Sequence, residues 1–240
     1  MATALRDLWD FDDPAGSEHR FRTLADEVDE ADEPMASRAR TQVARALGLQ
    51  GRYDEGHAVL DALSPGDPEV RVRVALERGR LLRSSGDDSG ARPCFDEAAA
   101  AARDAGLEEL EVDALHMLAL VAAPEERLDA HHTALARARA AADPAARDWD
   151  ASLLNNIGMA HADAGDHVAA LAAFEDALEA RRRIGDERRT RVARWMVAWS
   201  LRHLGQVEEA RAMQLALRAE LQAAGEHDPY VDEELELLGW

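Results

Sequence analysis

The chain carries a repeating pattern of small and large apolar residues at the spacing expected of paired helices. In residues 153–178 the apolar positions recur every three or four residues, and Gly165 divides the stretch into two segments. This period places the apolar side chains on one face of each segment, which predicts two antiparallel helices that pack on each other. The residues that mark the pattern are Ile157, Gly158, His161, Gly165, Ala170, Phe174 and Ala177.

Weaker copies of this helix pair recur along the sequence. The small residue that lets the first helix of each pair (helix A) approach the second (helix B) is Ala44, Gly79, Ala119, Gly158 and Ala198, at intervals of 35, 40, 39 and 40 residues. A glycine that favours a left-handed backbone follows helix A at Gly51, Gly86, Gly165 and Gly205. Because such helix pairs cannot bury their apolar faces singly, we expect them to stack.

Residues 37–223 resemble the tetratricopeptide repeat family. The chain is most similar in pattern to bacterial members that consist of the repeats alone. The resemblance implies an all-α, right-handed α-solenoid of about five helix pairs, with capping helices at about residues 15–36 and 228–240. We expect residues 1–240 to form one domain. Ser17 is predicted to cap the N-terminal helix, and Asp228-Pro229 to begin the last one. Pro124 follows the third helix A early, so that helix is expected to be short.

In this family the functional surface is the concave face, lined by helix-A residues beside the buried stripe. Arginines outnumber acids there, which favours an acidic ligand. Asn155 and Asn156 offer the amide donors and acceptors that hold an extended peptide, and Asn156 matches a groove asparagine common in peptide-binding members. The candidate binding residues are Arg45, Arg73, Glu77, Arg80, Asp113, His116, Asn155, Asn156, Met159, Trp195, Trp199 and Arg202.

Several structural alternatives remain open for these residues. An exposed arginine is often solvated or paired with a neighbouring acid, and Trp195 and Trp199 suit either one wall of a pocket or core packing. Asp113 and His116, three residues apart, suit an ion pair, or a small-anion or catalytic site. A full carboxylate-binding clamp is not predicted, since Trp195, Met196 and Trp199 occupy the next repeat.

Composition narrows the function classes. The formal charge of −20, with 48 acidic and 28 basic residues, disfavours nucleic acid and anionic membranes as partners. The single Cys94 excludes an internal disulfide, and the acidic N-terminus is unlike a secretory signal. We therefore expect a cytoplasmic, non-enzymatic scaffold that binds a protein or peptide, or a second copy of itself, with no cofactor and no metal.

Overall fold

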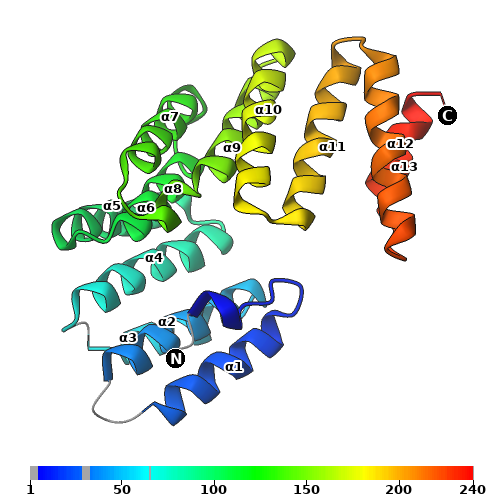
Figure 1. Cartoon of the computed structure of the whole chain (residues 1–240). Helices are drawn as coiled ribbons and strands as arrows, with labels where there is room; N and C mark the ends of the chain where they lie inside the picture. Colours follow the sequence, from blue (N-terminus) through cyan, green and yellow to red (C-terminus); the bar gives the residue numbers. More distant parts are fainter. Residues whose placement is uncertain (1–4, 29–32, 65, 240) are drawn as a thin grey trace. The chain divides into compact units, whose positions relative to one another are not determined.

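The computed structural model describes residues 5–28, 33–64 and 66–239 (Figure 1). Every regular element in these ranges is a helix, and none of the helices has an apolar stretch long enough to cross a membrane. The chain forms two compact units, Met1–Ala123 (unit 1) and Pro124–Trp240 (unit 2). The expectation of one continuous domain over residues 1–240 stays a prediction, and each unit is described by itself.

Unit 1 consists of stacked antiparallel helices. Its elements are the 3-10 helix η1 (Leu5–Leu8) and the α-helices α1 (Pro14–Glu27), α2 (Glu33–Leu49), α3 (Tyr53–Asp61), α4 (Pro68–Ser84), α5 (Asp88–Ala105) and α6 (Glu108–Leu120). Helix α2 packs on α1, α3 and α4, and α5 packs between α4 and α6. Helices α2, α4 and α6 are the predicted A helices and lie next to one another in that order.

Unit 2 repeats this arrangement. Its helices are α7 (Pro124–Ala140), α8 (Pro144–Arg147), α9 (Asp150–Asp163), α10 (His167–Ile184), α11 (Glu187–His203), α12 (Val207–Ala223) and α13 (Pro229–Leu237). From α9 to α13 each helix packs on the next, and α7 packs on α9. The short helix α8 is an extra turn that the apolar pattern does not predict.

In unit 1, the sequence predicts a short third A helix. This prediction is confirmed, since that helix, α6, has 13 residues.

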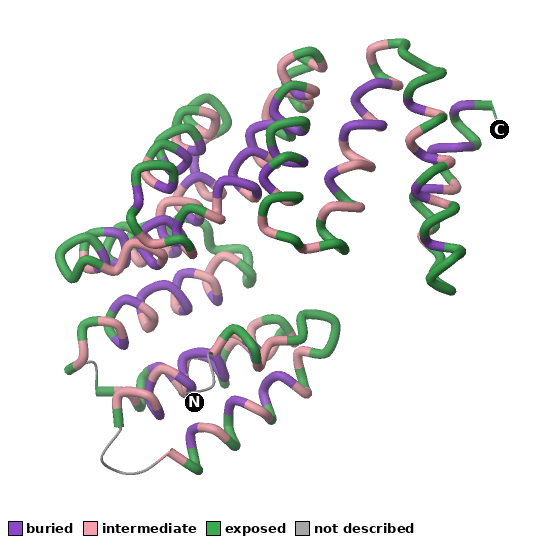
Figure 2. Tube along the Cα trace, viewed as in Figure 1, coloured by how far each residue is buried: buried purple, intermediate pink, exposed green. Residues whose placement is uncertain are grey.

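Close approach of helices A and B depends on a glycine beneath a phenylalanine ring. Phe95 and Phe174 are fully buried, at the centres of two apolar clusters. A Cβ atom added at Gly79 would lie 2.4 Å from the Phe95 ring, and one at Gly158 would lie 2.5 Å from the Phe174 ring. Figure 2 shows buried positions alternating with exposed ones along α10, and with mainly intermediate ones along α11. The predicted small-residue and aromatic pattern is therefore confirmed.

The helix ends agree with the sequence except at the N-terminus. The four glycines predicted to follow the A helices all have positive φ. At α13, Asp228 accepts a hydrogen bond from the Tyr230 amide and Pro229 occupies the first turn, as predicted. Ser17, in contrast, does not cap α1. Asp13 caps it, and Ser17 is buried within the helix with its hydroxyl bonded to the main chain of Asp10, because Asp13-Pro14 supplies a better start signal four residues earlier.

Gln214 is an exception to the apolar core of unit 2. It lies on α12 at the position that Phe95 and Phe174 occupy in the second and fourth repeats, and it is fully buried. Neither its amide nitrogen nor its amide oxygen has a hydrogen-bond partner among the described residues. A buried polar group without a partner loses its hydration and gains nothing in return.

Gln214→Leu is therefore expected to stabilise the protein by about 1–2 kcal/mol. The substitution removes the unpaired amide and keeps a side chain of similar size. The measurement is urea-induced unfolding followed by circular dichroism. Gln222→Leu is the matched control, since Gln222 lies on the same helix and is exposed. A destabilised Gln214→Leu variant would show that the amide has a polar partner after all.

Candidate functional site

The unit 1 residues predicted to bind lie on three helices, α2, α4 and α6. We group them with four neighbouring residues, Arg38, Gln42, Arg83 and Met117, under the name A face of unit 1. Its members are Arg38, Gln42 and Arg45 of α2, Arg73, Glu77, Arg80 and Arg83 of α4, and Asp113, His116 and Met117 of α6. These helices are sequential neighbours in the stack. The stacking therefore brings together residues that lie more than 30 positions apart in the sequence.

Arg80 is the centre of this surface. Its guanidinium donates to Glu77 of the same helix, at 2.6 Å, and to Asp113 of α6. The side chains of Glu77, Asp113 and Arg80 are only 2%, 10% and 13% exposed. Burial by itself would raise the pKa of Asp113, but the charges of Arg80 and Arg45 hold that pKa below its usual value. Asp113 is thus a buried, ionised carboxylate that bridges α4 and α6.

Arg45 differs from Arg80 because no carboxylate of the described residues forms an ion pair with it. Its guanidinium carbon lies over two aromatic rings instead, 5.4 Å from the centre of Trp9 and 5.5 Å from the centre of Phe11. Burial and repulsion from Arg80 lower the pKa of Arg45, although the guanidinium remains charged at neutral pH. Arg45 therefore retains positive charge that an external anion can neutralise.

A cavity of about 200 Å³ opens beside Arg45. Arg83 also lines it, and the Nε atom of Arg83 is buried without a hydrogen-bond partner in the part of the chain that the structure describes. The other lining residues are Gly48, Leu49, Arg80, Leu81, Ser84 and Met117. The cavity thus presents two unpaired guanidinium groups beside apolar side chains and a hydroxyl.

The two other arginines of the A face, Arg73 and Arg38, are paired. Arg73 contacts Glu69 at 2.8 Å, and Arg38 contacts Glu69 at 3.0 Å and Asp67 at 3.1 Å. The structural alternative, in which arginines of this surface pair with nearby acids, describes these positions. The unpaired positive charge lies at Arg45 and Arg83, towards the C-terminal ends of α2 and α4.

His116 follows Asp113 by one turn of α6, and its charge contributes to lowering the pKa of Asp113. A carboxylate with a lowered pKa is a weak base at neutral pH, and Asp113 is already bonded to Arg80. Asp113 thus has the features of a member of a structural ion-pair network.

In unit 2 the candidate residues lie on α9 and α11. Asn155 and Asn156 are half-buried, and Met159 is exposed. The α11 residues contact the C-terminal helix: the Trp195 indole donates to the Tyr230 carbonyl at 3.2 Å, and Arg202 makes two 2.8 Å bonds to Glu234. In this structure, Trp195 and Arg202 hold α13 in place.

Trp199 lies in a different environment from Trp195. Its ring is 4.1 Å from that of His203 and 5.8 Å from that of His167, and it packs on the cluster around Phe174. Trp195 packs on the separate cluster of α12 and α13. The two tryptophans therefore belong to two different clusters, which is the core-packing alternative considered from the sequence.

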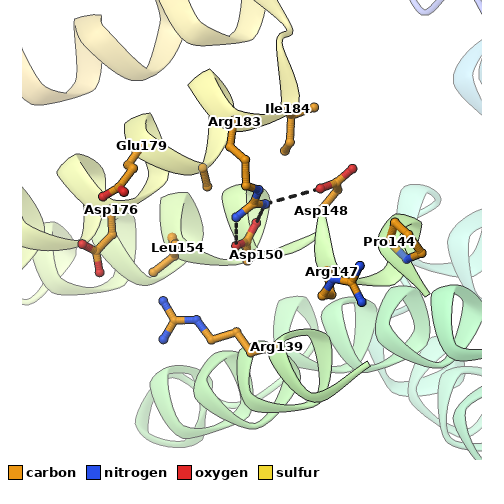
Figure 3. Close-up of a pocket in the computed structure, with 11 residues that line it drawn as sticks. Arg139, Pro144, Arg147, Asp148, Asp150, Leu154, Asp176, Glu179, Arg183 and Ile184 are labelled. Carbon is orange, nitrogen blue, oxygen red and sulfur yellow. Dashed lines mark hydrogen bonds and ion pairs between the residues drawn. The ribbon is translucent and has the colours of Figure 1, made fainter. Parts of the chain in front are cut away.

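The sequence pattern does not predict a second cavity, of about 790 Å³, in unit 2 (Figure 3). Arg183 of α10 crosses one side of it and bonds both carboxylate oxygens of Asp150, at 2.8 and 2.9 Å. Arg139, Asp176 and Glu179 also line it and have no ion-pair partner within the described ranges. The only local sequence signal for this cavity is the run of arginines at residues 181–183. The residues that Arg181 and Arg183 bond, Ser152 and Asp150 of α9, lie about 30 residues earlier, so the run alone does not reveal the cavity.

Stacked antiparallel helix pairs of this kind define the α-helical repeat proteins. The tetratricopeptide repeat family model matches residues 149–219, so this part of the chain consists of tetratricopeptide repeats. No curated protein sequence gives a match.

Solved structures of low sequence identity share this fold. BtubC (BKLC) from P. vanneervenii has a TM-score of 0.61 and 17% identity, over 95% of each chain. NprR in complex with its cognate peptide NprX has a TM-score of 0.56 and 15% identity, over 95% of this chain and 66% of that one. Bacillus thuringiensis PlcR in complex with the peptide PapR7 and DNA has a TM-score of 0.56 and 13% identity, over 96% and 84%.

Proposed function

We propose that the protein is a non-catalytic scaffold that binds an acidic peptide or protein segment on the A face of unit 1. The observation that carries this proposal is the pair Arg45 and Arg83. Both line one cavity, and neither forms an ion pair with a described carboxylate. Unpaired guanidinium groups beside apolar surface bind carboxylates through two parallel hydrogen bonds. This local positive charge can attract an acidic ligand even though the whole chain carries a formal charge of −20.

Two further observations support the proposal. The ion pairs of Arg80 hold α4 and α6 together, so the surface is ordered before a ligand arrives, which reduces the entropy lost on binding. The similar structures of NprR and PlcR contain bound peptides. In unit 2, Asn155, Asn156 and Met159 on α9 would provide a second contact surface for the same kind of partner.

The wider expectations from the sequence are part of the same proposal. They are a cytoplasmic location, no cofactor, no nucleic-acid or membrane partner, and self-association as one form of partner. A small anion, held in the cavity between Arg45 and Arg83 and near Asp113 and His116, is the second candidate, because 200 Å³ suits a small molecule.

The test is recovery of a protein partner from a lysate with the purified chain as bait. Arg83→Gln is expected to reduce recovery of a specific partner about tenfold or more, since it removes a charge-assisted contact. Asn156→Ala is expected to reduce recovery if unit 2 contributes. Arg78→Gln is the matched control, because Arg78 lies on the same helix but pairs with the exposed Asp61.

Equal recovery by Arg83→Gln and the wild type would overturn the proposal. If phosphate or citrate instead raises the melting temperature of the wild type but not that of Arg83→Gln, the small-anion candidate is favoured.

A further inference from the structure

Residues 5–11, which precede α1, contact helices that carry the A face of unit 1. Arg6 contacts Glu109 of α6 at 3.1 Å, and the Trp9 indole donates to the Gln42 side chain of α2 at 3.0 Å. Arg45 lies over the rings of both Trp9 and Phe11. Residues Leu5–Phe11, which we call the N-terminal segment, thus contact two of the three helices that form the proposed binding surface.

The two aromatic rings of this segment stack on each other and lie under the guanidinium of Arg45, as the rings of a bound peptide would. The Trp9 and Phe11 rings stack on each other with centres 4.8 Å apart and planes 3° apart, and Phe11 remains 48% exposed. Asp10 separates the two aromatic residues in the sequence, and a single guanidinium, that of Arg45, lies over both rings.

The main chain of the segment is hydrogen-bonded to α1, and its apolar side chains pack on both α1 and α2. Arg20 of α1 donates to the Leu8 carbonyl at 2.8 Å, and Ser17 of α1 bonds the main chain of Asp10. The Trp9 ring lies 5.0 Å from the ring of Phe21 of α1. The hydrogen bond, the ion pair and the cation–π contacts that join the segment to α2 and α6 involve side chains only. Release of the segment from the A face therefore breaks only side-chain contacts with these two helices.

The charge of the segment matches the proposed ligand. Around its two aromatic residues stand four acids, Asp7, Asp10, Asp12 and Asp13, against the single Arg6. Arg6 and Glu109 are both well exposed, at 64% and 39%, so this ion pair is screened by solvent. The chain thus places an acidic, aromatic sequence of its own beside the unpaired charge of Arg45.

We propose that the N-terminal segment is an internal occupant of the A face, and that the partner is an acidic segment with two aromatic side chains separated by one residue. The partner binds Gln42 and Arg45 by displacing Trp9 and Phe11. This inference rests on the proposed function, because it assigns the chemistry of the ligand and the competitor for the same surface.

The test uses the full chain and a fluorescent peptide with the sequence of residues 4–13. The Trp9→Ser/Phe11→Ser chain, in which the occupant is lost, is expected to bind the peptide about tenfold or more tightly than the wild type. A segment that occupies the surface for about 90% of the time would reduce the apparent affinity about tenfold. Adding Arg45→Gln to that chain is expected to abolish binding. A peptide with serine in place of both aromatics is the negative control.

A second measurement uses the wild type, in case the double variant does not fold. Trypsin cleaves after Arg6, and an excess of the same peptide, synthesised with Gln in place of Arg6, is expected to accelerate that cleavage about threefold or more as the segment is released. Peptide binding equal in wild type and variant, or absent from both, with unchanged cleavage, would overturn the inference. If a protein partner is nevertheless recovered by the wild type and lost in Arg83→Gln, the proposed function holds although this inference fails. The two failures are therefore distinguishable.

Discussion

Arg80→Met is expected to destabilise the protein by about 3 kcal/mol at pH 7, because it leaves two buried carboxylates without their cation. Arg80 bonds Glu77 and Asp113, and both of these side chains are nearly inaccessible to solvent. Urea-induced unfolding measures the change. Arg78→Met is the matched control on the same helix; Arg78 pairs with an exposed aspartate, so its replacement is expected to cost less than about 0.5 kcal/mol.

The pH dependence of this effect has a defined sign. The pKa of Asp113 is lower in the folded protein than its ordinary value, so its ion pair contributes stability above the unfolded pKa of about 3.9 and loses it as the pH falls through the folded pKa. The gap in stability between the wild type and Arg80→Met should therefore narrow below about pH 4. Asp113→Asn should recover part of the loss in the Arg80→Met background. A gap that is the same at pH 7 and at about pH 2–3 would mean that the buried carboxylates are not its source.

Gly158→Ala is expected to destabilise the protein by about 2–3 kcal/mol, although alanine is the better helix former by up to about 1 kcal/mol. The added Cβ would lie 2.5 Å from the ring of Phe174, which is fully buried and cannot move aside. Thermal unfolding followed by circular dichroism measures the loss.

The companion variant for this prediction is Gly158→Ala/Phe174→Leu. The smaller leucine makes room for the methyl group, so the double variant should be less stable than the wild type but lose less than the two single changes added together. The fifth repeat provides a natural precedent, since it has Ala198 at the glycine position and Gln214 at the phenylalanine position. Additive losses would indicate that the glycine and the ring do not contact each other.

The helix pairs could be predicted from the sequence because the period of apolar residues and the glycines after each A helix act over short distances. Gly165 and Gly205, for example, are recognisable without knowledge of the fold, and their positive φ follows from their position at a helix end. The five A helices accordingly contain the five small residues that the spacing identified.

The state of the candidate binding residues could not be predicted in the same way. Whether Arg80 or Arg45 is paired depends on which acid the next helix presents, and Asp113 lies 33 residues from Arg80. The apolar period gives the face of each helix but not the rotation and offset that place one charge beside another. For the same reason the contact of Trp9 with Gln42, across 33 residues, has no local signal.

The glycine and phenylalanine of a repeat share one volume between two helices, so neither position is free to change alone. A larger residue on helix A requires a smaller or more flexible one on helix B, as at Ala198 and Gln214. In a set of related chains these two positions should therefore exchange as a pair, and that covariation would mark the repeat register even where the remaining sequence has diverged.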